Sequence, residues 1–336
     1  AYTTIDKPTD YFNTKLFTGN NSANHSITGV GFQPDLIWFK SRNNAHDHSL
    51  VDSVRGRKAI ASNDTYAEIT LNADKDFQSF DSDGFTVDVV EQLNSFNRSG
   101  EPIVTWNWLA GGTASSNTDG SITSSVSANT TAGFSIVSYT GTGSNATVGH
   151  GLGVAPKFMI FKSIAVSNWG VYHESLGNTD AVFLNDTTAT GSSSVYWNNT
   201  SPTSSVFSLG NGGTNGGSTN NTGGMIAYCF AEKKGYSKFG SYAGNSSTDG
   251  TFIYTGFKPA LVIFKSTAGT ESWSMVDNKR DTFNVVKKQL FPNLSNAAET
   301  TNNVMDFCSN GFKMRNNDSR YNLSGYTYIY MAFAEN

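Results

Sequence analysis

The chain writes one pattern three times, with a period of about 100 residues, and this repeat restricts the fold more than any other feature. Each copy opens with an aromatic–x–Gly triplet, at Phe17, Tyr139 and Tyr242. A proline follows 17 residues after each of these aromatics, and a Lys-Ser pair begins six residues after the proline. These repeated residues are Pro34 and Lys40, Pro156 and Lys162, and Pro259 and Lys265. Three copies of one structural unit are therefore expected.

The segment between each proline and lysine predicts a central β-strand. "PDLIWFKS" is apolar at successive positions, as in a strand buried on both faces, and proline is tolerated where a strand begins. Short apolar segments alternate with Gly-, Asn-, Ser- and Thr-rich turns throughout the chain, and only 15% of residues are charged. We expect an all-β protein of three tandem antiparallel β-sandwich domains, jelly-roll or concanavalin-like, arranged in a row.

The spacing of the repeats predicts the domain boundaries. We expect an N-terminal arm (1–10), a first sandwich (11–110), a Gly/Ser/Thr linker (111–132), a second sandwich (133–232), a short linker (233–235) and a third sandwich (236–336). Because the first linker is long and polar and the second is short, we expect the second and third copies to lie close together. The first copy should be held more loosely.

Composition excludes several classes of partner. The net charge of −4 offers no basic surface for nucleic acid or anionic lipid. No run of 18 apolar residues is present, so membrane insertion is not expected, and no secretory signal is visible at the start. Cys229 and Cys308 lie in separate apolar segments, which favours buried free thiols. No cofactor is expected.

The repeated lysines Lys40, Lys162 and Lys265 are candidates for Schiff-base or phosphate chemistry. The alternative is a lysine that ends a buried strand with its ammonium group in solvent, and this is favoured because an enzyme rarely needs one nucleophile in three copies. No G-x-S-x-G, H-E-x-x-H, Walker or Rossmann motif occurs. Paired carboxylates for glycoside hydrolysis stay open, since their separation depends on the fold. We expect a protein without catalytic residues.

Residues 46–52, "HDHSLVD", contain weak metal-ligand candidates in His46, His48 and Asp52. Trp169 and Trp273 stand where His48 stands, which favours a position for a flat ring over a metal ligand. The aspartates between Asp74 and Asp83 suggest a calcium loop, but they lack the spacing and closing Glu of an EF-hand. A turn explains them equally well, and the calcium question stays open.

Several motifs together resemble a module common in virion structural proteins of tailed bacteriophages, especially marine ones. In the first copy they are Gly31–Arg42, His48–Gly56, Phe80–Val87, Asn97–Gly100 and Val104–Ala110. Residues 132–163 match as a second copy, and "GFKPALVIFKS", "SNGFKM" and "NLSGYTYIYMAFAE" match as a third. The resemblance covers the chain apart from the first ten residues and 111–131. The second copy lacks the "DGF" and "VRG" elements, which puts its surface function in doubt.

The resemblance implies a virion protein assembled in the cytoplasm of a bacterial host. Our leading hypothesis is a non-enzymatic component of the tail or tail fibre that adheres to host-surface glycan through its loops. Alternatives are a capsid decoration or head-fibre protein, docked through the N-terminal arm, and a free lectin-like carbohydrate-binding protein. Expected partners are other virion proteins and further copies of the chain, with a trimer as one form. Tyr196 and Trp197 are candidates for stacking on sugar rings, the alternative being a strand that packs them inward.

Overall fold

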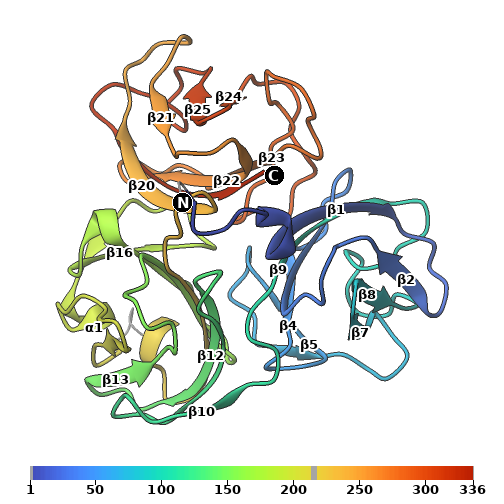
Figure 1. Cartoon of the computed structure of the whole chain (residues 1–336), viewed down its shortest axis with the longest axis vertical. Coiled ribbons are helices and arrows are strands. Elements are labelled where there is room, and N and C mark those ends of the chain that lie inside the picture. Colours follow the sequence, from blue (N-terminus) through green and yellow to red (C-terminus); the bar gives the residue numbers. More distant parts are fainter. Residues whose placement is uncertain (1–2, 213–217, 336) are drawn as a thin grey trace.

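A computed structural model describes residues 3–212 and 218–335. The chain is all-β and its named sheets are antiparallel, as predicted (Figure 1). Each repeat contributes one larger inner sheet and one smaller outer sheet. Among the described residues, no helix has the length and apolar character needed to cross a bilayer.

The first unit (residues 11–110) has the inner sheet β1-β9-β3-β4-β5-β6 and the outer sheet β2-β8-β7. Its strands are β1 (Phe12–Thr18), β2 (His25–Thr28), β3 (Leu36–Ser41), β4 (Ser49–Asp52), β5 (Lys58–Ala61), β6 (Ile69–Thr70), β7 (Phe77–Asp81), β8 (Gly84–Val87) and β9 (Pro102–Trp108). A 3-10 turn, η1 (Pro8–Asp10), precedes them.

The second unit (residues 111–232) has the inner sheet β10-β11-β12-β19-β14-β15-β16-β17 and the outer sheet β13-β18. Its elements are β10 (Ser115–Asn117), β11 (Ser124–Asn129), β12 (Phe134–Gly141), β13 (Ala146–Gly149), β14 (Phe158–Ser163), β15 (Trp169–His173), η2 (Glu174–Leu176), β16 (Asp180–Phe183), β17 (Gly191–Ser192), α1 (Ser194–Trp197), β18 (Val206–Leu209) and β19 (Gly223–Phe230).

The third unit (residues 236–335) has the inner sheet β20-β26-β22-β23 and the outer sheet β21-β25-β24. Its strands are β20 (Ser237–Ala243), β21 (Phe252–Tyr254), β22 (Pro259–Ser266), β23 (Ser274–Asp277), β24 (Met305–Cys308), β25 (Gly311–Met314) and β26 (Thr327–Ala334).

The repeated apolar phrase forms the central strand of each inner sheet, as predicted. β3, β14 and β22 are buried at every position. Each pairs on one side with the closing strand of its unit, β9, β19 or β26, and on the other with β4, β15 or β23. One face of each central strand packs on the outer sheet, where Phe39 meets Phe85 in the first unit.

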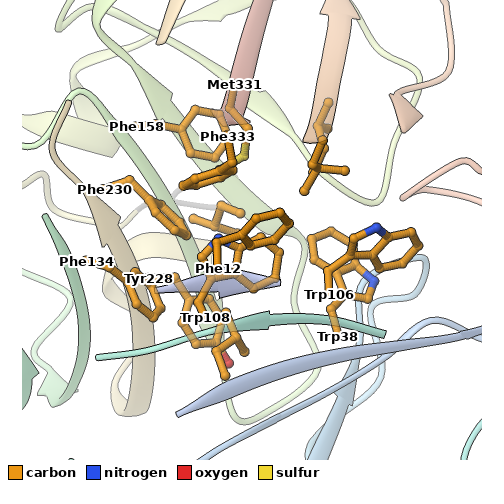
Figure 2. Close-up of a cluster of buried hydrophobic side chains, with 14 of the residues drawn as sticks. Phe12, Trp38, Trp106, Trp108, Phe134, Phe158, Tyr228, Phe230, Met331 and Phe333 are labelled. Carbon is orange, nitrogen blue, oxygen red and sulfur yellow. The ribbon is translucent and has the colours of Figure 1, made fainter. Parts of the chain in front are cut away.

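The opposite faces of the three inner sheets meet in one shared core (Figure 1). Trp108, Phe230 and Phe333 hold equivalent places on the closing strands, and their ring centroids lie 5.7 to 6.3 Å apart (Figure 2). We call the cluster around this triangle the central core. The prediction of three domains in a row, with the first held loosely, is therefore wrong. The units close around an axis because each inner sheet has a second apolar face to bury.

The segment predicted as a flexible linker, 111–132, is also corrected by the structure. It forms β10 and β11, and β11 pairs along β12 to extend the inner sheet of the second unit. Ser124, Val126 and Ser127 are buried, whereas Ser125 is exposed. A partly buried strand made of serine and small residues has the composition of a linker, so composition alone does not reveal it.

The N-terminal arm packs against the rest of the chain instead of projecting. Ile5 is buried in the central core, and the backbone N–H of Thr4 donates to the carbonyl of Lys234 (2.9 Å). The arm thus joins the first unit to the short linker (233–235) that precedes the third.

Candidate functional site

Equivalent rings join each unit to the one before it. Trp169 Nε1 donates to the carbonyl of Ala61 in the first unit (2.8 Å), and Trp273 Nε1 donates to that of Phe183 in the second (2.8 Å). His48 holds the same place in the first unit, where its buried ring lies beside the backbone of Phe291 from the third unit but makes no hydrogen bond through Nε2. This position therefore carries a flat ring at each of the three junctions.

The metal-ligand candidates do not converge. His46 Nε2 lies 2.9 Å from Oε1 of Glu101, whereas His48 accepts a hydrogen bond at Nδ1 from Trp38 Nε1 (2.8 Å). Burial lowers the pKa of His48 well below its ordinary value. Asp52 faces the second unit. Within residues 3–212 and 218–335, no group of three or more His, Cys, Asp or Glu side chains could hold a metal ion.

Asp52 instead belongs to a buried polar contact between the first and second units. Its Oδ2 accepts from the hydroxyl of Tyr228 (2.8 Å) and from Arg55 Nε (2.7 Å). The neighbouring carboxylate charge holds the pKa of Arg55 above its ordinary value, although burial acts against the charged form.

The same contact recurs where the third unit meets the first. Asp277 accepts from Arg280 Nε (2.5 Å) and from Trp106 Nε1 (3.2 Å), and both members of the ion pair are fully buried. At the remaining junction His173 takes the place of the aspartate and lies 3.1 Å from the carbonyl of Tyr330. The three polar contacts thus join the first unit to the second, the second to the third, and the third to the first.

The repeated lysines are buried, which corrects the expectation of ammonium groups in solvent. Lys40, Lys162 and Lys265 each donate to the carbonyl of the following serine, at 2.9, 2.6 and 2.8 Å. Lys265 also donates to the carbonyl of Thr187 in the second unit (3.2 Å). The ammonium groups cap loop carbonyls beneath the surface. Burial lowers the pKa of each lysine to about 8.

Raising the pH from 8 to 9 is expected to stabilise the folded chain. Each of these lysines has a pKa of about 8 when folded and 10.5 in its ordinary state, so the unfolded chain binds more protons in this window. The free energy of unfolding should rise by about 1 kcal/mol per lysine, as measured by urea titration at both pH values. In Lys162→Met about a third of the rise should vanish. Stability that is flat or falls across this window would contradict the assignment.

The pH window ends near 9 because thiols and then tyrosines of the unfolded chain increasingly lose protons there, which acts in the opposite direction. Burial raises the pKa of the Cys229 thiol and of the Tyr139 hydroxyl, so both groups ionise more readily in the unfolded chain. Cys229 and Cys308 are both free, with Cys229 buried as expected and Cys308 only partly so.

Tyr196 and Trp197 do not offer sugar-stacking faces. They are 4% and 1% exposed and lie on the short helix α1. Trp197 packs on Phe161 and donates from Nε1 to the carbonyl of Asp180 (2.9 Å). The prediction of glycan contact is corrected, since the helical turn directs both rings into the second unit instead of holding them in a loop.

Two of the four aspartates from Asp74 to Asp83 accept from backbone N–H groups. Asp74 instead accepts from Gln78 Nε2 (3.3 Å), and Asp81 accepts from the hydroxyls of Ser79 (2.7 Å) and Thr86 (2.6 Å). Oδ1 of Asp76 accepts from the N–H groups of Glu91 (3.0 Å) and Leu93 (3.2 Å). Asp83 accepts from Gly31 and Gly29, and these bonds lower its pKa. Their geometry is that of loop and turn caps.

An exposed aromatic pair distinguishes the third unit. Phe252 and Tyr254 on β21 are 45% and 65% exposed, whereas Ile253 between them points into the unit. Solvent-facing positions of a strand are ordinarily polar, so two neighbouring rings on this face need an explanation.

The other two units show that the fold does not require these rings. Ile27 and Val148 hold the position of Ile253, each opposite a buried phenylalanine of its outer sheet. The residues flanking them are Ser26 and Thr28 in the first unit and Thr147 and Gly149 in the second. Small residues suffice there, so the aromatic pair is particular to the third unit.

Charged side chains lie beside Phe252 on the same outer sheet. Lys313 lies opposite Phe252 and binds Asp249 Oδ1 (2.7 Å), which also accepts from Arg315 Nη1 (2.6 Å). Arg315 Nε donates to Asp306 Oδ2 (2.7 Å). Two acids and two bases therefore form a network without net charge. Hydrogen bonding and charge from Lys313 lower the pKa of Asp249, which keeps it ionised as an acceptor.

We name Phe252, Tyr254 and this charged network the aromatic platform. The sequence analysis missed it, although "TFIYTG" contains the signal. Phe252, Ile253 and Tyr254 are three successive large apolar residues, whereas the first two copies have a small residue on each side of the apolar one. In the sequence alone the triplet resembles a short buried strand, but in the structure its two outer residues face solvent.

Comparison with known proteins adds a family but no described activity. Neither the curated proteins nor the solved structures yield a match to this chain. One family model, described as a domain of unknown function (DUF7483), matches residues 7–336. Because that match spans all three units and nearly the whole chain, the protein belongs to the DUF7483 family.

Proposed function

We propose that the chain is a non-enzymatic component of a tailed-bacteriophage virion, in the tail or tail-fibre apparatus, which binds host-surface glycan through its aromatic platform. The exposed pair Phe252 and Tyr254 carries this proposal, because the equivalent positions in the other units are small. Each repeat would be a small two-layer sandwich of jelly-roll or concanavalin-like type. Other virion proteins would be its structural partners.

The chemistry of the platform suits a sugar. A pyranose ring has a face of C–H groups, which packs on an aromatic ring, and a rim of hydroxyls that donate and accept hydrogen bonds. The carboxylates of Asp249 and Asp306 and the cations of Lys313 and Arg315 supply charged partners for such hydroxyls. Since these four charges cancel, the platform favours neutral over acidic sugars.

The virion setting rests on the sequence resemblance, and the structure of the chain is compatible with it. Both cysteines are free and the three units share one core, so the fold does not depend on disulfides, which suits assembly in a reducing host cytoplasm. Gold-labelled antibody on purified particles tests the location. Label at the tail end supports the proposal, and label over the head would favour capsid decoration instead.

Removing either ring of the platform is expected to weaken glycan binding about tenfold. The ligand would first be found by screening the chain on a glycan array, and Phe252→Ala and Tyr254→Ala would then be titrated against it. Tyr66→Ala is the matched control, because Tyr66 is 63% exposed but lies outside the third unit. Absence of any glycan ligand, or equal binding by all variants, would refute the proposal.

A further inference from the structure

A groove of about 330 Å³ lies at the aromatic platform, where the third unit meets the N-terminal arm and the linker before it, and Thr3, Glu232, Lys234 and Gly235 also line it. Ser237 and Lys238 from the start of β20 form one side, and Tyr254 and Gly256 at the end of β21 form the other. β20 is the last strand of its inner sheet, and the described residues provide no further strand along this side.

The backbone of β20 presents hydrogen-bonding groups toward the open side. The carbonyl of Tyr236 accepts from Ala334 N–H (2.8 Å), so Tyr236 and every second residue after it face β26. Phe239 and Ser241 therefore direct their N–H groups outward. The N–H of Phe239 donates to Glu232 Oε2 (3.4 Å) and that of Ser237 to the carbonyl of Lys233 (2.9 Å). Among the described residues of this edge, Ser241 and Ala243 therefore hold the N–H groups that an added strand can engage.

In the second unit the chain fills the equivalent space with its own strand. β12 corresponds to β20, and β11 pairs along its outer edge, with Ser127 opposite Ile136. Gly151 corresponds to Gly256, and a Cβ built on Gly151 would lie 3.0 Å from Val126 and 3.1 Å from Ala128. Thus β11 occupies the place that is open in the third unit.

In the first unit the opening is bridged by side-chain contact. Asn13 on β1 donates from Nδ2 to the carbonyl of Val30 (3.0 Å), and these residues correspond to Lys238 and Gly256. The equivalent opening is therefore filled by β11 in the second unit and bridged by Asn13 in the first, and it remains a groove in the third.

We propose that this groove accepts an extended segment of a partner chain, which adds as a strand to the outer edge of β20. Strand addition of this kind gains its affinity from main-chain hydrogen bonds and its specificity from alternate side chains. The partner segment should carry small residues and serine at alternate positions, as Ser124–Asn129 does in β11. This docking function goes beyond glycan binding, although the groove shares Tyr254 with the aromatic platform, and it would attach the chain to a neighbouring protein of its assembly.

A synthetic peptide with the sequence of residues 120–130, GSITSSVSANT, probes the groove. We expect saturable binding to the full chain, with added hydrogen-exchange protection in β20 at Ser241 and Ala243, whose N–H groups face outward. Two further peptides carry backbone N-methyl groups on alternate residues, one set facing β20 and the other facing away. The first set should bind about tenfold more weakly or worse, and the second should bind as the parent peptide does.

The variant Ser241→Pro tests the same contact from the protein side. Ser241 is exposed and its N–H points away from β26, so proline removes a docking donor without breaking the ladder. Peptide binding should fall about tenfold or more while glycan binding is unchanged. No binding at millimolar peptide, equal binding of both methylated peptides, or protection elsewhere would overturn the proposal. The methylated peptides decide the matter if the variant does not fold.

Discussion

Replacing Trp108 by alanine is expected to lower the free energy of unfolding by about 3–5 kcal/mol. Trp108 is 1% exposed, and its ring lies 6.3 Å from Phe230 of the second unit and 5.7 Å from Phe333 of the third. The substitution therefore opens a cavity at the place where all three units meet. Denaturant titration followed by far-UV circular dichroism measures the loss.

The control for this substitution is an exposed aromatic residue. Phe283 is 85% exposed, so Phe283→Ala should change the free energy of unfolding by no more than about 0.5 kcal/mol. A loss below about 1 kcal/mol for Trp108→Ala would mean that the inner sheets do not pack on one another as described.

Replacing Arg280 by methionine is expected to destabilise the chain by a similar amount, about 3–5 kcal/mol. Arg280 and Asp277 are fully buried, and removal of the guanidinium leaves a carboxylate with only Trp106 Nε1 and backbone N–H groups as partners. The double variant Asp277→Asn with Arg280→Met should recover part of the loss, because it removes the unpaired charge.

Lys7→Met provides the matched control, because Lys7 and Asp10 form an ion pair with the same three-residue spacing at 63% and 47% side-chain exposure. An exposed pair contributes about 0–1 kcal/mol, so this variant should unfold almost as the parent chain does. Equal effects of Arg280→Met and Lys7→Met would show that Asp277 is solvated, and the buried junction between the third and first units would then be wrong.

Strands were predicted best where the sequence repeats itself. The apolar segments ending at Lys40, Lys162 and Lys265 all became central strands, because continuous apolar character in a short segment suits a strand buried on both faces. The matching of His48 with Trp169 and Trp273 likewise identified a structural ring position. Internal comparison separated what the fold reuses from what a single copy adds.

Closure of the ring could not be predicted from the same segments. Because β3 is apolar on both faces, the sequence indicates that both faces are buried. It does not indicate whether a face is covered by the outer sheet of the same unit or by another unit. The serine-rich composition of β11 concealed its pairing with β12. The polar neighbours of Tyr196 and Trp197 left both sugar stacking and inward packing open, whereas Phe252 and Tyr254 were overlooked because the residue between them, Ile253, is apolar. Local composition does not report which face of a short element meets solvent.

Native-state hydrogen exchange along the three central strands tests the shared core most directly. If β3, β14 and β22 belong to one cooperative body, their slowest amides should exchange with the same free energy of opening, equal to that of global unfolding. If the amides of β3 open at a distinctly lower free energy than those of β14 and β22, the first unit unfolds separately. The three units would then be independent domains, and the closed ring described here would be contradicted.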